Sequence, residues 1–196
     1  MKTIGITGGV GAGKSSVLSY IGDNYNCKIV YADDLAKNLE AKGGPCYSPL
    51  LELLGDDILR EDGEIDPGKM SLKVFGRPDI LKKVNDIVHP AVKTSVIQTI
   101  KEEKEAKKID FLFLEAALLI ECGYREILDE IWYVRADEDV RRRRLKESRG
   151  YSDEKTDKIL ASQLKDEIFA ANADHIINNN DNLEKTYQQI DKLLSK

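Results

Sequence analysis

Gly8-Gly-Val-Gly-Ala-Gly-Lys14-Ser15 directly follows the apolar and β-branched run Thr3 to Thr7, and a helical pattern, Ser16 to Ile21, continues it. The spacing fits G-x-x-x-x-G-K-[ST], in which backbone N–H groups surround phosphate oxygens, the lysine reaches the β- and γ-phosphates, and the hydroxyl ligates Mg²⁺. The positive end of the helix dipole faces the same anion. The sequence therefore predicts a strand, a phosphate-binding loop (P-loop) and a helix, and with them the use of a nucleoside triphosphate.

The candidate nucleotide ligands lie in this loop and at the start of the helix. The alternative interpretation, a glycine-rich turn beside a solvated lysine, is disfavoured because strand, loop and helix occur in the required order. We expect Mg²⁺ to be held by the Ser15 hydroxyl through the nucleotide. The residues expected to bind ATP are Gly11, Ala12, Gly13, Lys14, Ser15 and Ser16.

Composition and charge restrict the class of protein. The chain has 196 residues, with 30 Lys and Arg against 35 Asp and Glu and a net charge of −5. This length suits one domain without disulfides, and the acidic balance argues against general binding of nucleic acid or of an anionic membrane. The N-terminus begins a strand without a secretory segment, and no apolar run has transmembrane length. We expect a cytoplasmic protein, either a monomer or a weak homo-oligomer.

The three cysteines carry no signal of a disulfide framework or a zinc site. Cys27, Cys46 and Cys122 are odd in number, widely separated and without metal-ligand spacing. They are predicted to be buried, reduced thiols.

Short apolar runs alternate with helical patterns along the chain, which is typical of an α/β fold with a mainly parallel sheet covered on both faces. Strands are expected at Thr3 to Thr7, Cys27 to Ala32, Phe111 to Glu115, Glu130 to Val134 and His175 to Asn178. The predicted fold class is a P-loop NTPase-type, three-layer α/β/α domain with a five-stranded parallel sheet. Ligands of such sheets bind at the carboxyl ends of the strands. This rule places four parts of the chain on one edge of the sheet: Gly8 to Ser15, Asp33, Glu115 to Leu119 and Asn179.

The interval from Asp34 to Asp110 is too long for a single crossover helix and is expected to hold a helical unit. Helices are predicted over Asp34 to Glu40, over Tyr47 to Gly55 and over a long periodic segment. Pro90, after His89, predicts a kink in that segment or a break between two helices. Its expected apolar face comprises Leu81, Val84, Ile87, Val88, Ala91, Val92, Val96, Ile97 and Ile100.

A second helical interval follows the fourth strand. Asp139 to Ser148 has a helical pattern, a turn is expected at Arg149 to Tyr151, and Ser152 to Lys155 resembles a capping box that opens a helix through about Ala171. We expect this interval to fold over the nucleotide as a lid. An amphipathic helix, Asn182 to Leu194, should pack on the sheet.

These intervals divide the single predicted P-loop domain into three parts. Residues 1–33, 109–140 and 172–196 are expected to form the nucleotide-binding core. The helical substrate subdomain is expected over 34–108, and the lid over 141–171.

A P-loop alone does not distinguish a kinase from a GTPase or a motor ATPase. Guanine-specific switches usually carry Asn-Lys-x-Asp, and Asn178-Asn-Asn-Asp181 lacks the lysine, which disfavours a GTPase. Small phosphotransferases need a carboxylate near the acceptor hydroxyl, arginines around the transferred phosphate and a lid that excludes water. Asp33, expected to end the second strand, is the candidate general base or orients Mg²⁺ through water. Asp34 competes for this role, and either aspartate can instead be the N-cap of the following helix.

Arg141 to Arg144 surround one predicted helix with guanidinium groups. Because successive helical residues point in different directions, at most two of the four can face the site while the others meet solvent. A solvated basic helix face is the alternative. Arg144 is the candidate for contact with the transferred phosphate.

The chain resembles the dephospho-coenzyme A kinase family nearly from end to end. The matching elements are Thr7 to Ser16, Ala32-Asp33 with Ala36, His89-Pro90, Leu118 to Glu121, Arg144-Leu145, Gln163 and Ala173 to Asn179. The resemblance implies ATP-dependent phosphorylation of the 3′-hydroxyl of dephospho-coenzyme A (dephospho-CoA), the last step of coenzyme A biosynthesis. It also implies a nucleotide-binding core, a helical unit that receives the acceptor, and a lid.

The resemblance also implies roles for individual residues. Asp33 would be the base, Lys14 and Ser15 would bind phosphate and Mg²⁺, and Arg144 would bind phosphate at the lid. Asn179 would lie near adenine. On the acceptor side, substrate binding is expected at His89 and Leu118.

Two other functions remain open from the residues. One is a different small-molecule P-loop kinase acting on a nucleoside, a nucleotide or a hydroxy acid, which the long insertion and His89-Pro90 disfavour. The other is a non-catalytic nucleotide-binding regulatory module, which Asp33 and Arg144 disfavour. The leading prediction is an active dephospho-CoA kinase.

Overall fold

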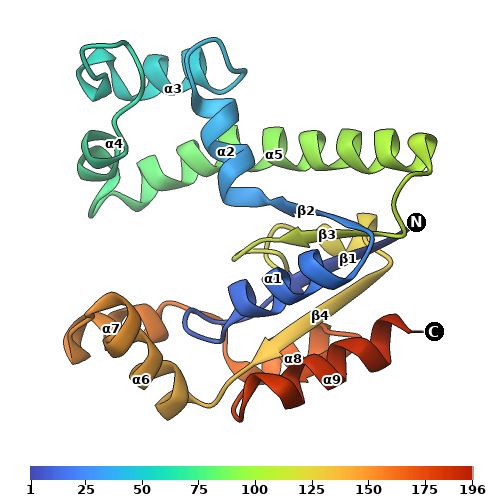
Figure 1. Cartoon of the computed structure of the whole chain (residues 1–196). Coiled ribbons are helices and arrows are strands. Elements are labelled where there is room, and N and C mark those ends of the chain that lie inside the picture. The colour runs from blue at the N-terminus through green and yellow to red at the C-terminus, as the bar shows by residue number, and fades with distance from the viewer. Residues whose placement is uncertain (196) are drawn as a thin grey trace. The chain divides into compact units, whose positions relative to one another are not determined.

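β1 occupies the centre of a five-stranded sheet in this computed structural model, which describes residues 1–195 (Figure 1). The strand order is β2-β3-β1-β4-β5, and β1 pairs in parallel with both β3 and β4. β4 in turn pairs in parallel with β5. The strands are β1 (Lys2–Thr7), β2 (Cys27–Tyr31), β3 (Phe111–Glu115), β4 (Glu130–Arg135) and β5 (His175–Asn178). The predicted α/β class with a five-stranded parallel sheet is confirmed.

Two compact units make up the described chain. The first comprises Met1–Val30 and the chain from Glu103 onward, and the second is Tyr31–Glu102. The first unit carries the sheet, and the second is helical.

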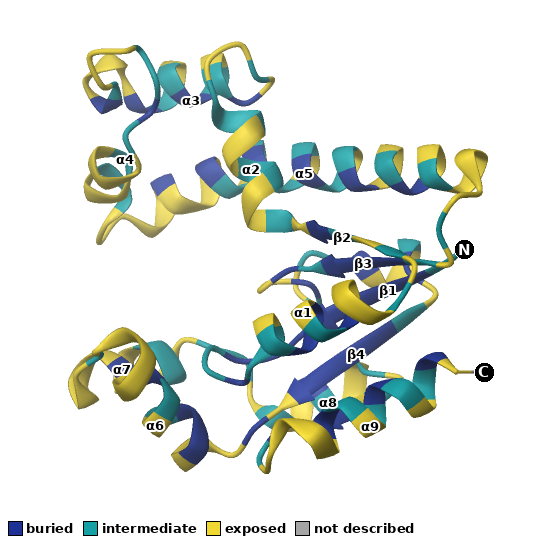
Figure 2. Cartoon of the chain, viewed as in Figure 1, coloured by how far each residue is buried: buried dark blue, intermediate teal, exposed yellow. Residues whose placement is uncertain are grey.

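One face of the sheet is covered by α1 (Lys14–Asn24) and α9 (Leu183–Leu194). Their apolar side chains join inward-facing residues of β1, β3, β4 and β5 in one buried cluster. The rings of Tyr20 and Tyr187 stack with centroids 3.9 Å apart and tie the two helices together. The predicted C-terminal amphipathic helix therefore packs on the sheet, and β1, β3 and β4 are largely buried (Figure 2).

On the opposite face, α8 (Asp166–Asn172) packs on β4, and Leu119 and Leu128, which flank the short 3₁₀ helix η2 (Tyr124–Ile127), lie against Gly5 of β1. Phe169 of α8 is 3% exposed, and its ring stacks on Tyr133 of β4 at a centroid distance of 5.1 Å. α8 is separate from the preceding α7 (Asp153–Ala161), so the prediction of one helix through Ala171 is wrong. The physical reason is that Phe169 belongs to the sheet's apolar layer, which requires the chain to turn after α7.

α6 (Glu138–Arg149) and α7 form a helical hairpin after β4. Gly150 ends α6 with φ of 61°, a left-handed conformation that favours glycine. The hydroxyl of Ser152 accepts a hydrogen bond from the backbone N–H of Lys155 and caps α7, as the sequence predicted.

The second unit consists of α2 (Ala32–Glu40), α3 (Tyr47–Leu54), η1 (Asp56–Ile58), α4 (Pro67–Val74) and most of α5 (Pro78–Ala106). The buried residues of α5 recur every four positions: Ile80, Val84, Val88, Val92, Val96 and Ile100. Ile80 was missed by the sequence analysis. Leu81 and Ile97, predicted for this face, are each 46% exposed, because the buried stripe is narrower than the predicted one.

α5 continues through Pro90, so the predicted break between two helices did not occur. Proline removes one helical hydrogen bond. Val88 and Val92, on either side of it, are both buried, and this packing keeps the helix continuous.

Two further expectations need correction. β2 ends at Tyr31, so Ala32 is helical and Asp33 lies in the first turn of α2 rather than at the end of the strand. The N-cap of α2 is Tyr31, so neither Asp33 nor Asp34 caps the helix.

All three cysteines are free, as predicted. Only Cys46 is fully buried, whereas Cys27 and Cys122 are partly exposed. Among residues 1–195, no helix is both long enough and apolar enough to cross a bilayer.

Candidate active site

The loop between β1 and α1 holds the centre of the candidate site. Gly13, at φ 94°, is the N-cap of α1 and accepts hydrogen bonds from the N–H groups of Ser16 and Val17. No side chain caps this helix within the described residues. Its first turn therefore presents backbone N–H groups and the positive end of the helix dipole toward a ligand, as anion binding requires.

Lys14 folds back over the loop. Its Nζ donates to the carbonyl oxygen of Gly8 at 2.8 Å and lies 3.5 Å from Oε1 of Glu115. Glu115 ends β3, the neighbour of β1, and the two side chains are only 14% and 17% exposed. The ammonium group is thus held above the loop in a largely shielded setting.

Carbonyl oxygens of the loop are bound from its outer side. Arg141 of α6 donates from Nε to the carbonyl oxygen of Val10 at 2.9 Å. The carbonyl oxygen of Ala12 accepts from Asn179 Nδ2 at 2.8 Å and from Arg144 Nη1 at 3.4 Å. Side chains from two distant segments therefore fix the shape of the loop.

Asn179 is 1% exposed, and both ends of its amide are used within the protein. Nδ2 binds the loop at Ala12, and Oδ1 accepts from the hydroxyl of Thr186 at 2.9 Å. Nδ2 also occupies the place that a side chain at Gly13 would need, so only glycine fits there. The structure puts this side chain against the P-loop, and its place near adenine stays a prediction.

The four consecutive arginines separate as the helical spacing predicts. Arg141 is buried, and Arg144 donates to the carbonyl oxygen of Asn179 at 2.8 Å, so these two face the loop. Arg142 instead pairs with Glu138 and Asp157, and Arg143 is exposed. Burial lowers the pKa of Arg144, and the neighbouring charge of Arg143 adds to this effect. An anion beside Arg144 would compensate for this loss of hydration.

Ser15 fits a magnesium–nucleotide complex. It is exposed at the first turn of α1, so its hydroxyl is accessible to a ligand. Over residues 1–195, no group of three His, Cys, Asp or Glu side chains could hold a metal ion alone. Mg²⁺ commonly binds with few protein ligands together with substrate phosphates, and the donor set here suits that mode.

The remaining predicted site residues are distributed over both units. Asp33 is exposed on α2, and His89 is half-buried on α5, both in the second unit. Leu118 is 44% exposed in the turn after β3, in the first unit, while its neighbour Leu119 is fully buried against Gly5. Asp34 forms an ion pair with Lys37 at 2.8 Å.

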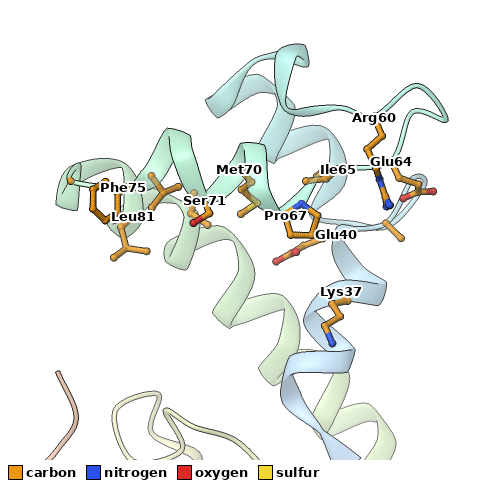
Figure 3. A pocket seen from close by; sticks show the side chains of 14 residues that line it. Lys37, Glu40, Arg60, Glu64, Ile65, Pro67, Met70, Ser71, Phe75 and Leu81 are labelled. Atoms are coloured by element: carbon orange, nitrogen blue, oxygen red, sulfur yellow. The ribbon is translucent and has the colours of Figure 1, made fainter. Parts of the chain in front are cut away.

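The second unit contains a cavity of about 740 Å³ (Figure 3). Phe75 and Leu81 lie at one end, and Arg60 and Glu64 lie at the other. Burial raises the pKa of Glu40, which also lines the cavity. Its apolar and charged ends together suit a long, amphipathic small molecule.

Three residues at the loop were not assigned a role from the sequence: Arg141, Glu115 and Gln163. Arg141 lies three positions before Arg144 and so shares its helix face, which was an available signal. Glu115 was placed on the sheet edge without a role. Only the fold brings Gln163 to the loop, where its Oε1 accepts from the backbone N–H of Val10 at 3.3 Å.

Comparisons with known proteins agree with this geometry. The family model of dephospho-CoA kinase matches residues 2–185. Dephospho-CoA kinase of Streptococcus mutans is 35% identical over 195 residues, covering 100% of this chain and 97% of that protein. Its counterpart from Carboxydothermus hydrogenoformans is 35% identical over 196 residues, covering 100% and 94%.

Solved structures share the fold. A Thermus thermophilus protein superposes with a TM-score of 0.81 at 27% identity, over 99% of this chain and 96% of that one. Dephospho-CoA kinase from Campylobacter jejuni superposes with a TM-score of 0.73 at 19% identity, over 100% of this chain and 96% of that one. Shikimate kinase from Acinetobacter baumannii superposes with a TM-score of 0.55 at 12% identity, over 100% of this chain and 94% of that one. This likeness indicates the fold alone. On the strength of its full-length relatives and its phosphate loop, the chain belongs to the dephospho-CoA kinase family.

Proposed function

We propose that Lys14, Arg144 and Asp33 carry the reaction of this kinase, the ATP-dependent phosphorylation of dephospho-CoA in coenzyme A biosynthesis. The observation that carries the proposal is the uncapped first turn of α1 beneath the folded-back Lys14. Backbone donors and an ammonium group there converge on one anion-sized place. The family membership supplies the reaction and the acceptor.

The P-loop and Lys14 bind the phosphates of ATP. In a trans peptide the N–H group points away from the carbonyl oxygen, so carbonyls held outside the loop turn the N–H groups of Gly11 and Gly13 inward. Lys14 reaches the β- and γ-phosphates from above. Ser15 would hold Mg²⁺ through the nucleotide, and the ion would neutralise charge on the phosphates.

Charge stabilisation rather than covalent chemistry accounts for the rate. Phosphoryl transfer spreads negative charge over the three equatorial oxygens of the transferred group. Lys14 and Arg144 are the cations at the loop that would meet this charge. Both are already held by carbonyl oxygens, Lys14 by Gly8 and Arg144 by Asn179, so little reorganisation is needed during the reaction.

Asp33 accepts or directs the proton of the acceptor hydroxyl. Its exposed position in the first turn of α2 leaves the carboxylate accessible to a substrate. Asp34, the competing candidate, is engaged with Lys37. This difference favours Asp33.

The cavity of the second unit receives the acceptor. Its volume of about 740 Å³ lies within the range typical of small-molecule sites. The apolar end at Phe75 and Leu81 suits the pantetheine arm, and Arg60 suits a phosphate of the acceptor. Binding of dephospho-CoA by His89 and Leu118 remains part of the proposal.

The segment 141–171 acts as a lid over the nucleotide. We place the moving part in α7, because α8 packs on the sheet through Phe169. A cytoplasmic location and a monomeric or weakly self-associating state complete the proposal and rest on composition.

ADP release measured against dephospho-CoA, adenosine, AMP and shikimate tests the function. Turnover is expected with dephospho-CoA, and turnover on another acceptor alone would overturn the assignment of the substrate. ATP binding without turnover on any acceptor would indicate a regulatory module, a function that the family membership does not favour.

A matched pair of variants tests the base. Asp33→Asn should lower kcat by orders of magnitude and leave ATP binding intact, since it removes the proton acceptor but no phosphate ligand. Asp34→Asn, which removes an exposed ion pair, should retain activity. Near-normal kcat in Asp33→Asn would refute the assigned role.

A further inference from the structure

The backbone of Val10, in the P-loop, is held at both of its polar groups by side chains from the segment after β4. Its carbonyl oxygen accepts from Nε of Arg141 at 2.9 Å, and its N–H group donates to Oε1 of Gln163 at 3.3 Å. The same Gln163 oxygen accepts from Nη2 of Arg141. The three residues therefore form one closed set of hydrogen bonds.

This set determines how the loop presents its donors. Because the peptide group is planar, holding the carbonyl of Val10 on the outside directs the N–H group of Gly11 to the opposite side. Arg144 and Asn179 hold the carbonyl of Ala12 in the same way, which directs the N–H group of Gly13 to the opposite side. Alternate peptides of the loop are thus oriented before any phosphate arrives.

Arg141 binds the loop backbone and is shielded from solvent. It is 8% exposed, and its guanidinium fills the space that a side chain at Gly9 would need. A buried guanidinium requires acceptors for its donors, and the carbonyl of Val10 and the amide oxygen of Gln163 provide them. Arg141 therefore differs in function from Arg142, whose partners are Glu138 and Asp157.

We propose that Arg141 and Gln163 are positioning residues that preform the phosphate-binding loop and couple it to the helical hairpin of α6 and α7. Gln163 follows the end of α7, so a displacement of α7 acts directly on the N–H group of Val10. The α6–α7 hairpin, through Arg141 and Gln163, keeps the P-loop in the shape that binds phosphate. The coupling to lid movement rests on the proposed function, but the effect on ATP affinity does not.

The test measures ATP binding by calorimetry without acceptor, together with kcat and KM. Gln163→Leu removes the acceptor that Val10 and Arg141 share and should weaken ATP binding by about tenfold, within the range expected when such hydrogen bonds are lost. The loss should fall mainly on the KM for ATP, with kcat less affected. In the variant without nucleotide, the amide hydrogen of Val10 should exchange faster, because it has lost its acceptor, Oε1 of Gln163.

Two further variants separate positioning from general stability. Gln163→Glu keeps an acceptor oxygen beside Arg141 and Val10, so exchange of the Val10 amide should stay close to that of wild type. Arg142→Gln changes the neighbouring arginine and its ion pairs within the hairpin, and should leave ATP affinity within about twofold of wild type, as expected for partly exposed pairs. Equal losses in Gln163→Leu and Arg142→Gln would mean that only the stability of the hairpin matters.

A double-mutant cycle between Arg141→Gln and Gln163→Leu completes the design. Residues acting through one peptide should show non-additive effects on ATP affinity. Unchanged ATP affinity and unchanged exchange of the Val10 amide in folded Gln163→Leu would overturn the proposal. A wild-type protein that binds ATP but fails to phosphorylate dephospho-CoA would instead contradict the proposed function and leave this inference standing.

Discussion

The ammonium group of Lys14 lies 3.5 Å from the carboxylate of Glu115, across the carboxyl ends of two neighbouring strands. The carboxylate holds the lysine near the loop, and it also repels a bound triphosphate. We therefore expect Glu115 to limit ATP affinity while it keeps Lys14 in place.

Glu115→Gln should bind ATP several-fold more tightly than wild type, because the repulsive charge is removed while the side-chain shape is retained. Calorimetric titration with ATP measures this change. Lys14→Ala removes the other member of this ion pair and serves as the control. Its kcat should fall by about 10² to 10³, the size of effect expected when one main electrostatic donor is lost. Weaker binding in Glu115→Gln would mean that holding Lys14 outweighs the repulsion.

Asn179→Ala should lower the free energy of unfolding by about 1–3 kcal/mol, because it leaves the Thr186 hydroxyl and the Ala12 carbonyl without their buried partner. It should also raise the KM for ATP, since the loop loses a support. Urea denaturation and steady-state kinetics measure the two effects. Asn180→Ala, which removes a more exposed bond to the N–H of Asp137, should cost less on both measures. Equal losses of unfolding free energy and equal increases in the KM for ATP in the two variants would contradict a specific role of Asn179 in supporting the loop.

Thr7→Val should raise the free energy of unfolding by about 1 kcal/mol. Within residues 1–195, Thr7 Oγ1 is the one buried side-chain polar atom found without a hydrogen-bond partner, and burying an unpaired hydroxyl is unfavourable. Thr3→Val, on the same strand, should destabilise instead, because the Thr3 hydroxyl donates to Asp129 at 2.8 Å. Thermal unfolding of both variants checks the opposite signs. A destabilised Thr7→Val would contradict the assignment.

Asp174→Asn should lower stability at pH 7, and its difference from wild type should shrink only as the pH falls below about 4. The guanidinium of Arg125 holds the pKa of Asp174 below its ordinary value, and the N–H of Ile131 adds to this. A carboxylate with a lowered folded-state pKa stabilises the protein above its unfolded pKa, and this contribution is lost as the pH falls through the folded pKa. Urea denaturation of variant and wild type between about pH 2 and pH 7 should therefore give stability curves that converge at the acid end. A constant difference across that range would exclude this ionisation as the cause.

Phe75→Ala should raise the KM for dephospho-CoA by about tenfold without altering the KM for ATP, because it removes one apolar wall of the cavity proposed to receive the acceptor. Phe75 is 84% exposed, so the protein itself should lose little stability. Leu72→Ala is the matched control, because Leu72 is 79% exposed on α4 but does not line the cavity. Identical acceptor KM values for the two variants would place the acceptor elsewhere.

Local sequence determined the strands, the P-loop and the start of α1, because buried strands and glycine-rich turns are specified by residues adjacent in the chain. It also determined the cap of α7 at Ser152. Boundaries that depend on packing were predicted less well. α5 persists through Pro90 because its buried valines outweigh one lost hydrogen bond, and α8 separates from α7 because Phe169 is needed on the sheet.

Tertiary structure alone decided which side chains support the loop. Arg141, Gln163 and Asn179 lie more than 120 residues from the P-loop they bind, and their partners are backbone carbonyl and N–H groups, which carry no signature of their own in the sequence. The motif Gly8 to Ser15 determined that phosphate is bound. Which distant residues hold that motif in its binding shape depends on the strand order, because a parallel sheet brings the carboxyl ends of β1, β3, β4 and β5 to one edge.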